Sequence, residues 1–438
     1  MEEYKESGVD WIGKIPIEWE IKHFKNIVSL YNGNSISDSE KEYYEDSTEA
    51  YPYIATKDIN ANTNAIDYNN GLFVKKNDKS FKIAPKNSTL MCIEGGSAGR
   101  KKGFTNQKVA FVNKLCCFHS NSMNNKFIYY YLSSKSYIEN FNQFLTGLIG
   151  GVSLYNLKQF YIVIPSINEQ NMIADFLDKK VGKIDKILED LNKQIEILKK
   201  YRNNIIYEST TYGIENTADL IYTDNIFYKK THKNWHLVAL KRLTKVLTCG
   251  VASTPEYTDK DNGILFLSAQ NIQNNKLDLS TKNYIPSELH KKITKYTKPQ
   301  YGDVLQVRVG ATIGKSAIVD IKDEFSIYVS LTLMRVNEKI NNKYLNYVIS
   351  TDQFKQMVSL DVDFAGSQGN LNVGDLKETK IPLPDYKEQI KIINYLDEKC
   401  SNIDKTIQIK KNQIDKLENY KKSLIYEYVT GKKRVKEE

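Results

Sequence analysis

Two short stretches of this chain carry residue types that could do chemistry. The first, GATIGKS from Gly310 to Ser316, looks like a loop that cradles a nucleotide phosphate. That motif needs four residues between its first glycine and Gly-Lys-Ser, whereas this chain has three. The strand-like SAIVDI follows, where a phosphate site would have a helix N-terminus. The spacing therefore favours a tight turn between strands that carries Lys315 toward a polyanion.

The second stretch, HKNWH, places His232 and His236 four residues apart, as metal ligands on a helix can be. It lies in a polar lead-in without an acidic or thiol partner at ligand spacing, so surface histidines are the better interpretation. The sequence also lacks the G-x-S-x-G and H-E-x-x-H motifs, a dinucleotide loop and the Asn/Asp-Pro-Pro-aromatic signature of amino-methyltransferases. We expect no catalytic residue and no metal site.

Basic and amide side chains on glycine-rich loops remain as candidates. GGSAGRKKG presents Arg100, Lys101 and Lys102, and a guanidinium suits a guanine edge while lysines suit phosphates. Amides on comparable loops could pair with adenine. The further DNA-binding candidates are Lys57, Gln270, Asn271, Arg308, Lys315, Gln368 and Asn370. The alternative for each of them is a solvated loop residue.

Composition sets wider bounds. The chain has 438 residues, which favours two or more domains, and its formal charge of +9 suits a polyanionic partner without proving one. The five cysteines show no metal-binding or disulfide spacing, which favours a reduced, cytoplasmic setting. The polar start predicts no signal peptide, and no apolar run is long enough to span a membrane.

An internal repeat organises the sequence. PSINEQNMIADFLDKKVGKID begins at Pro165, and PDYKEQIKIINYLDEKCSNID begins at Pro384, with an offset of 384 − 165 = 219 residues. Before each copy, a segment opening at Trp19 or Trp235 alternates short apolar runs with Gly- and Asn-rich turns. These runs read as short strands. The chain is thus predicted to be two globules, mixed α/β or mainly β, each of about 150 residues and each followed by a helical module.

In each module we expect a first helix, through Leu177 in copy one, and a second helix from about Ile184. The second helix has apolar residues at heptad spacing. Its predicted seam comprises Ile184, Leu188, Leu191, Ile195, Leu198 and Ile205 in the first copy, and Ile403, Ile407, Ile414, Leu417 and Leu424 in the second. Packing of each helix on its own globule is the alternative. Two equivalent seams in one chain more simply pair with each other, antiparallel, about an approximate two-fold axis.

Three segments of the chain resemble segments of a known protein family. ESGVDWIGKIPIEW, IPSINEQNMIADFLDKKVGKID and IPLPDYKEQIKIINYLDEKCSNID are similar to segments of the specificity subunits of type I restriction–modification systems. The resemblance covers nearly the whole chain, because the P-x-x-x-E-Q…L-D…I-D pattern occurs twice. The first globule has GGSAGRKKG where the second has GATIGK.

The resemblance implies a mixed α+β fold, in which two target recognition domains each read one half of an asymmetric double-stranded DNA site. It assigns the spacing of the two half-sites to long antiparallel coiled-coil helices. It also implies two bound modification (methyltransferase) subunits, joined by restriction subunits. S-adenosylmethionine, ATP and magnesium would belong to those partners, with no cofactor in this chain. Arg100, Lys101 and Lys102 would then face the first half-site, and Arg308 and Lys315 the second.

The expected segments are 1–160 and 213–379 for the recognition domains, and 161–212 and 380–438 for the helical spacers. A non-catalytic DNA-binding subunit is the leading interpretation. A coiled-coil adaptor that binds only proteins comes second, and a self-contained enzyme comes third because its motifs are missing.

Overall fold

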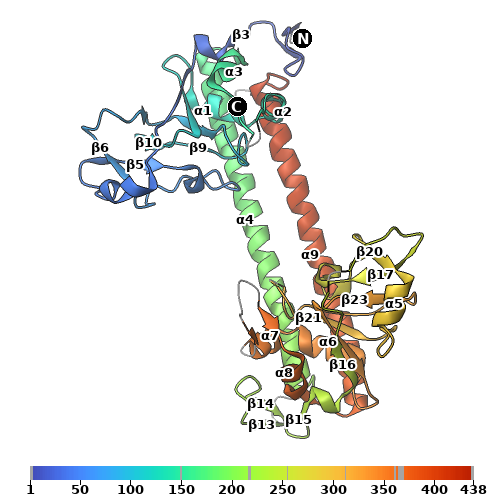
Figure 1. Cartoon of the computed structure of the whole chain (residues 1–438). Coiled ribbons are helices and arrows are strands. Elements are labelled where there is room, and N and C mark those ends of the chain that lie inside the picture. The colour runs from blue at the N-terminus through green and yellow to red at the C-terminus, as the bar shows by residue number, and fades with distance from the viewer. Residues whose placement is uncertain are drawn as a thin grey trace. The chain divides into compact units, whose positions relative to one another are not determined.

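The computed structural model of the chain describes residues 3–147, 150–215, 219–253, 255–310, 312–359, 362–363 and 369–435. Its contacts define two compact units: unit 1 comprises Met1–Asn192 with Lys411–Glu438, and unit 2 comprises Lys193–Lys410. Two long helices, α4 (Ile167–Tyr212) and α9 (Tyr386–Val429), each contribute residues to both units. They are the green and red helices of Figure 1. Each unit thus combines one globule with part of each long helix.

The globule of unit 1 contains two four-stranded sheets. One has the order β6 (Phe73–Lys75), β5 (Ala50–Ile54), β10 (Val109–Phe111) and β7 (Ile83–Ala84); the other has β4 (Ser29–Asn32), β11 (Leu115–His119), β8 (Thr89–Cys92) and β9 (Lys102–Phe104). β1 (Tyr4–Glu6) pairs with β2 (Lys14–Pro16), and β3 (Glu20–His23) with β12 (Tyr161–Ile164). The helices are α1 (Asn125–Ser133), α2 (Lys135–Gln143) and α3 (Leu154–Gln159).

Unit 2 repeats this plan. Its four-stranded sheet has the order β16 (Thr244–Cys249), β24 (Leu331–Val336), β21 (Val304–Val307) and β22 (Ser316–Ile318), and a three-stranded sheet has β20 (Asn283–Pro286), β17 (Gly263–Leu267) and β23 (Phe325–Ile327). The paired strands are β13 (Leu220–Tyr222) with β14 (Lys230–His232), β15 (His236–Ala239) with β27 (Lys380–Leu383), β18 (Ile272–Gln273) with β19 (Lys276–Leu277), and β25 (Val362–Asp363) with β26 (Asn370–Leu371). The helices are α5 (Ser287–Ile293), α6 (Asn342–Ser350), α7 (Asp352–Ser359) and α8 (Val373–Glu378).

The central strands of the two four-stranded sheets β4–β11–β8–β9 and β16–β24–β21–β22 form from short, largely apolar runs whose two faces are both covered. All four residues of β8 and of β21 are buried, and the neighbouring strands place Cys117 beside Leu90 and Leu333 beside Leu305. Phe24, Phe118 and Tyr131 fill the core of unit 1 between the sheet β4–β11–β8–β9 and the helices. The predicted mixed α/β globules are confirmed.

The two long helices run antiparallel within each unit. In unit 1 the ring of Phe176 packs against Tyr428, with centroids 4.5 Å apart, and nine residues further along α4 Asp185 binds Lys421, which lies earlier in α9. In unit 2 Gln194 accepts a hydrogen bond from Lys410, and further along α4 Arg202 pairs with Asp404, again earlier in α9. Every residue of the predicted seam is buried or half-buried.

The prediction of two helices per module was wrong. α4 is continuous from Ile167 to Tyr212 and α9 from Tyr386 to Val429, so no break separates Leu177 from Ile184. No proline interrupts residues 178–183, and Val181 is buried there in the core of unit 1. The single Gly182 costs only about 1 kcal/mol in a helix interior. Tertiary packing of the neighbouring apolar residues outweighs that cost. Among the described helices, none combines the length and apolar character that crossing a membrane requires.

Candidate nucleic-acid interface

The turn between β8 and β9 presents Arg100 to solvent. Gly99, with a φ of +72°, donates its N–H to the carbonyl of Cys92 at 2.8 Å, and Arg100 donates its N–H to Ser97 at 3.0 Å. A positive φ suits glycine because it has no Cβ. A cation therefore stands at the tip of a short, hydrogen-bonded turn.

The turn between β21 and β22 in unit 2 has the same construction. Gly314, with a φ of +87°, donates its N–H to Val307 at 2.9 Å, and Lys315 donates its N–H to Thr312 at 3.2 Å. Lys315 therefore holds the position in unit 2 that Arg100 holds in unit 1. β22 follows this turn as a strand, as the strand-like SAIVDI predicts.

A second glycine loop braces each turn. In unit 1 Gly95 donates its N–H to the carbonyl of Gly150 at 2.7 Å, and in unit 2 Gly310 donates to Gly369 at 3.2 Å. A hollow of about 490 Å³ lies beside the braced turn of unit 1, lined by residues that include Glu94, Gly147 and Ser153. Two loops that are distant in sequence thus form one surface in each unit.

Four of the predicted DNA-binding residues have exposed side chains: Lys57, Arg100, Gln270 and Asn370. Two others are half-buried and hold loops together. Lys101 donates to the carbonyl of Thr56 at 2.9 Å, which joins the turn to the loop of Lys57, and Lys315 donates to Gln273 at 3.3 Å. In unit 1 the structure thus joins the turn of Arg100 to the segment of Lys57, and in unit 2 it joins Lys315 to β18, which directly follows Gln270 and Asn271. Gln368 lies outside the described residues.

Three predicted residues are turned inward. Arg308 donates to the carbonyls of Leu371 at 2.9 Å and Val329 at 3.2 Å. Asn271 is buried and donates to the carbonyls of Asp278 and Thr281. Lys102 is 6% exposed and donates to Leu132 at 3.2 Å; its burial, with a smaller effect from Lys421, lowers its pKa to about 8. In this conformation these three side chains bind backbone carbonyls inside their own unit rather than face solvent.

The repeated motif has the same structural role in both units. Gln170 donates to the carbonyl of Pro165 and accepts from the backbone of Asn124, at 2.9 Å in each case. Gln389 does the same with Pro384 at 3.1 Å and Asn341 at 2.8 Å. Because these asparagines cap α1 and α6, each glutamine ties the start of a long helix to its own globule.

The aspartates of the motif continue this pattern. Asp178 accepts a hydrogen bond from Tyr130 at 2.5 Å, and Asp397 accepts one from Tyr347 at 2.6 Å. Burial, together with the neighbouring carboxylate, raises the pKa of both tyrosines. Asp185 and Asp404 bind Lys421 and Arg202 of the opposite helix. The paired residues thus attach each globule to the helices and the helices to each other.

Sequence reasoning missed a basic segment in unit 2. Lys291, Lys292 and Lys295 are exposed around Tyr296, whose side chain is 91% exposed. The interleaved letters HKKITKYTK could have revealed this segment, because alternating cations and aromatics are typical of nucleic-acid contacts. His232 and His236 lie on separate strands, and the described residues contain no acidic, thiol and histidine cluster that could hold a metal ion.

The comparisons with known proteins match this duplicated architecture. The family model of the "Type I restriction modification DNA specificity domain" matches residues 16–205 and again 232–419, one match for each repeat. The chain belongs to this family. The family is one of DNA sequence specificity in type I restriction–modification, and the antiparallel helices and two globules agree with the fold that the resemblance implies.

Individual relatives span almost the same length. The chain is 25% identical to the type I restriction enzyme MjaVIII specificity subunit of Methanocaldococcus jannaschii, over 97% of this chain and 95% of the relative. It is 23% identical to the StySPI specificity subunit of Salmonella potsdam, over 96% and 90%. A chain solved in work on complex assembly and conformational transition of the type I R-M system shares the fold, with a TM-score of 0.71 and 13% identity over 95% of this chain and 98% of that one.

Proposed function

We propose that this chain is the non-catalytic DNA-reading subunit of a type I restriction–modification complex and that each unit reads one half of an asymmetric double-stranded site. The observation that carries the proposal is the repeated braced turn. Arg100 and Lys315 occupy matching positions on turns with matching hydrogen bonds, in globules whose other loops differ. Two turns with the same backbone hydrogen bonds but different side chains suit the recognition of two different DNA sequences.

The long helices serve as the scaffold in this proposal. Their outer faces carry Tyr201 and Tyr420, which lie 420 − 201 = 219 residues apart and are each 55% exposed. Two equivalent exposed surfaces suit two copies of one partner, which we take to be the modification subunits, with restriction subunits joining them in the cytoplasm. S-adenosylmethionine, ATP and magnesium are assigned to those partners.

Co-purification with the modification subunits tests the proposal. The complex should bind its site with affinity that falls steeply as salt rises, because released counterions contribute to binding. Mapping of methylated bases in a host that carries the complex would identify a site with two unlike halves. Methyl transfer by the purified chain alone would contradict the non-catalytic role. Affinity for partner proteins without any DNA binding by the complex would favour an adaptor instead.

For the individual residues, Arg100→Ala should weaken binding to the first half-site by roughly 1–3 kcal/mol if its guanidinium grips a base edge. Lys315→Ala should affect only the second half-site. Lys102→Met serves as the control, because its side chain is buried on Leu132 and its loss should leave the surface of the turn intact. Unchanged affinity of Arg100→Ala for every altered half-site would contradict the assignment of this turn.

A further inference from the structure

The basic segment of unit 2 comprises residues 291–298, from the end of α5 onward. Lys295 lies over the ring of Tyr296, with its Nζ 5.4 Å from the ring centroid. Lys298 is held by Glu324, whereas no ion pair is found for Lys291, Lys292 or Lys295 within the part of the chain that the structure describes. Three lysines without an ion pair among the described residues thus lie within five residues of an almost fully exposed aromatic ring, and Lys295 lies over that ring.

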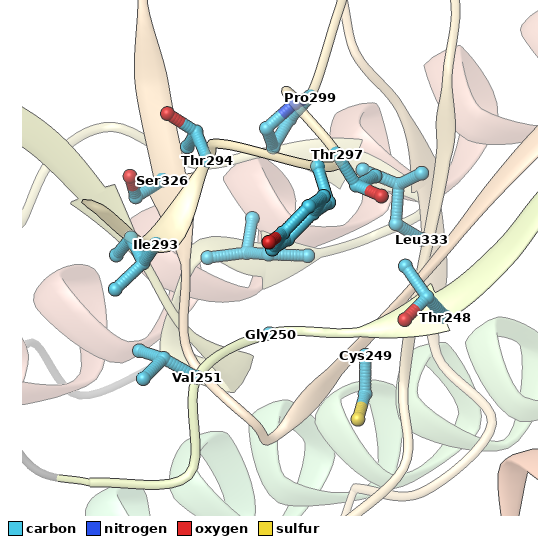
Figure 2. A pocket seen from close by; sticks show the side chains of 12 residues that line it. Thr248, Cys249, Gly250, Val251, Ile293, Thr294, Thr297, Pro299, Ser326 and Leu333 are labelled. Carbon is cyan, nitrogen blue, oxygen red and sulfur yellow. The ribbon is translucent and has the colours of Figure 1, made fainter. Parts of the chain in front are cut away.

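A pocket of about 310 Å³ opens beside this ring. One side is formed by the end of β16 and the following turn, from Thr248 to Val251, and the other by Ile293, Thr294, Thr297 and Pro299. Figure 2 shows these two stretches facing each other, with the sulfur of Cys249 pointing away from the opposite side. The walls combine methyl groups with a few hydroxyls, and a mostly apolar lining with a small number of polar groups is typical of ligand pockets.

The repeat explains why this space is open. Gly33 of unit 1 and Gly250 of unit 2 occupy equivalent positions. A Cβ on Gly33 would clash with the backbone carbonyl of Phe111, and a Cβ on Gly250 would clash with that of Ile327. Two positions earlier, Tyr31 of unit 1 packs its ring 5.9 Å from that of Phe111 and donates to the carbonyl of Ile83 at 2.9 Å. Unit 2 has Thr248 there, paired with Leu333 as Tyr31 is paired with Cys117. Unit 2 therefore lacks the aromatic ring that fills this position in unit 1.

We propose that this pocket and Tyr296 receive one unstacked nucleobase of the bound DNA, while Lys291, Lys292 and Lys295 contact the phosphates beside it. The inference rests on the proposed DNA-reading function and adds a second contact element, distinct from the turn of Lys315. It also makes the two units differ, because in unit 1 the ring of Tyr31 occupies the position that Thr248 leaves open in unit 2.

The energies are compatible with this proposal. Stacking of a base on an aromatic side chain is worth about 1–3 kcal/mol, and unstacking a base costs a few kcal/mol, least when the base is already mismatched. Phosphate contacts by the three lysines offset the remainder through counterion release. If one base leaves the stack here, binding should therefore tighten when a mismatch weakens the pairing of that base.

A mismatch scan tests the inference directly. The probe is duplex DNA that carries the mapped target, with one base pair at a time replaced by a mismatch across and beside the half-site read by unit 2. For the parent complex we expect one position at which the mismatch tightens binding by about fivefold or more. That gain should disappear in Tyr296→Ala and in Thr248→Tyr, which places in unit 2 the side chain that fills unit 1.

The lysines have a separate readout. Changing Lys291, Lys292 and Lys295 to Gln should reduce the slope of log affinity against log salt by about 0.9 for each phosphate contact, or roughly 2–3 in total. A matched control changes Lys233, Lys241 and Lys245 to Gln. It removes the same charge from unit 2, but at lysines that pair with Asp219, Glu378 and Glu338. The control should leave the slope close to that of the parent.

The outcomes separate this inference from the proposed function. If the parent complex binds its target with normal specificity but no mismatch tightens binding, the base pocket is wrong and the DNA-reading function stands. A gain that persists in Tyr296→Ala would also overturn it, since this exposed side chain can be removed without unfolding the unit. Failure of the parent to bind any mapped target would instead contradict the proposed function itself.

Discussion

Arg202 and Lys421 hold the same position in the two repeats, and each binds an aspartate of the opposite helix. Arg202 donates Nε and Nη2 to the carboxylate of Asp404, at 3.0 and 3.4 Å. Lys421 binds Asp185, and both aspartates come from the I-D element of the motif. A polar residue on a helix seam limits the registers in which the helices can pair. These pairs therefore specify one antiparallel register in each unit.

Reversing one charge tests this role. Asp404→Arg should lower the free energy of unfolding by about 1 kcal/mol, because the pair is partly exposed and its attraction is screened by solvent. The double variant Arg202→Asp with Asp404→Arg should recover most of that loss. Urea denaturation measures the effect, and the Asp185–Lys421 pair of unit 1 provides a parallel cycle. A double variant no more stable than the single reversal would show that these pairs do not set the register.

Buried Lys102 gives unit 1 a pH dependence of known sign. Its pKa in the folded chain is lowered to about 8, from an ordinary value of 10.5. Between these values the unfolded chain binds more protons than the folded chain, so the stability contributed by this residue rises with pH. We expect the free energy of unfolding to increase from pH 8 to 10.5 by up to about 3 kcal/mol relative to Lys102→Met.

Urea denaturation of the parent and Lys102→Met across this pH range measures that difference. Lys102→Met should also be the more stable protein at pH 7, because it removes a buried charge. Lys101→Met is the matched control, since the Lys101 side chain is only half-buried and binds a carbonyl near the surface. Parallel pH profiles for the parent and Lys102→Met would show that the amine is not desolvated.

At the scale of elements, the sequence predicted a pair of long helices with an apolar seam, but not how far each helix extends. Apolar spacing from Ile184 to Ile205 revealed the seam, because burial of a heptad stripe leaves a periodic signal. The uninterrupted α4 was missed because Gly182 and the β-branched Val181 are weak helix formers, and packing around Val181 decides the conformation there. The inward turn of Arg308 and Asn271 could not be predicted either, because their partners, such as Leu371 and Asp278, become neighbours only through the fold.

Gly182 within α4 and Gly431 just after α9 should respond to substitution in opposite directions. A Cβ on Gly182 would meet nothing within 4 Å, so Gly182→Ala should stabilise the chain by about 0.5–1 kcal/mol. Gly431 follows α9 with a φ of +73°, and its Cβ would lie 2.4 Å from Pro16 and 3.0 Å from the ring of Trp19. Gly431→Ala should therefore destabilise unit 1 by roughly 2–4 kcal/mol.

Gly213 supplies the matched control for this pair. It follows α4 with a φ of +88°, but its Cβ would stand 3.6 Å from Trp235, an ordinary contact. Gly213→Ala should thus cost about 1–2 kcal/mol, from the backbone conformation alone. Thermal unfolding of the three variants ranks them. Equal losses for Gly213→Ala and Gly431→Ala would mean that the contact with Pro16 relaxes freely.

At the scale of the whole molecule, we expect the helices to set the gap between the two half-sites. Seven residues inserted after Asp190 in α4 and after Ile414 in α9 would preserve the heptad phase and lengthen each helix by about 10 Å. At about 3.4 Å per base pair, the gap should widen by about three base pairs. Mapping of methylated bases would show the same half-sites further apart. An unchanged gap in an active, folded variant would refute the spacing role.

The two units also differ in when they can be completed during synthesis. Unit 2 is built from one uninterrupted stretch, Lys193–Lys410, whereas unit 1 joins the first residues of the chain to the last. Lys432 donates to the carbonyl of Ile12, 420 residues earlier, and Arg434 binds Glu169 beside Trp19. At a ribosome speed of about 5–20 residues per second, the globule made first waits roughly 10 s or more for its closing helix.

Until then, the apolar side chains of Phe176, Ile184 and Leu188 lack the part of α9 that covers them in the finished unit 1. Exposed apolar surface of this kind makes a nascent chain prone to misassembly. A chain released before Lys411 would keep every residue of unit 2 and leave unit 1 open. Unit 2 can therefore be completed before unit 1, although the globule of unit 1 is synthesised first. Premature release would leave that globule without the part of α9 that closes it.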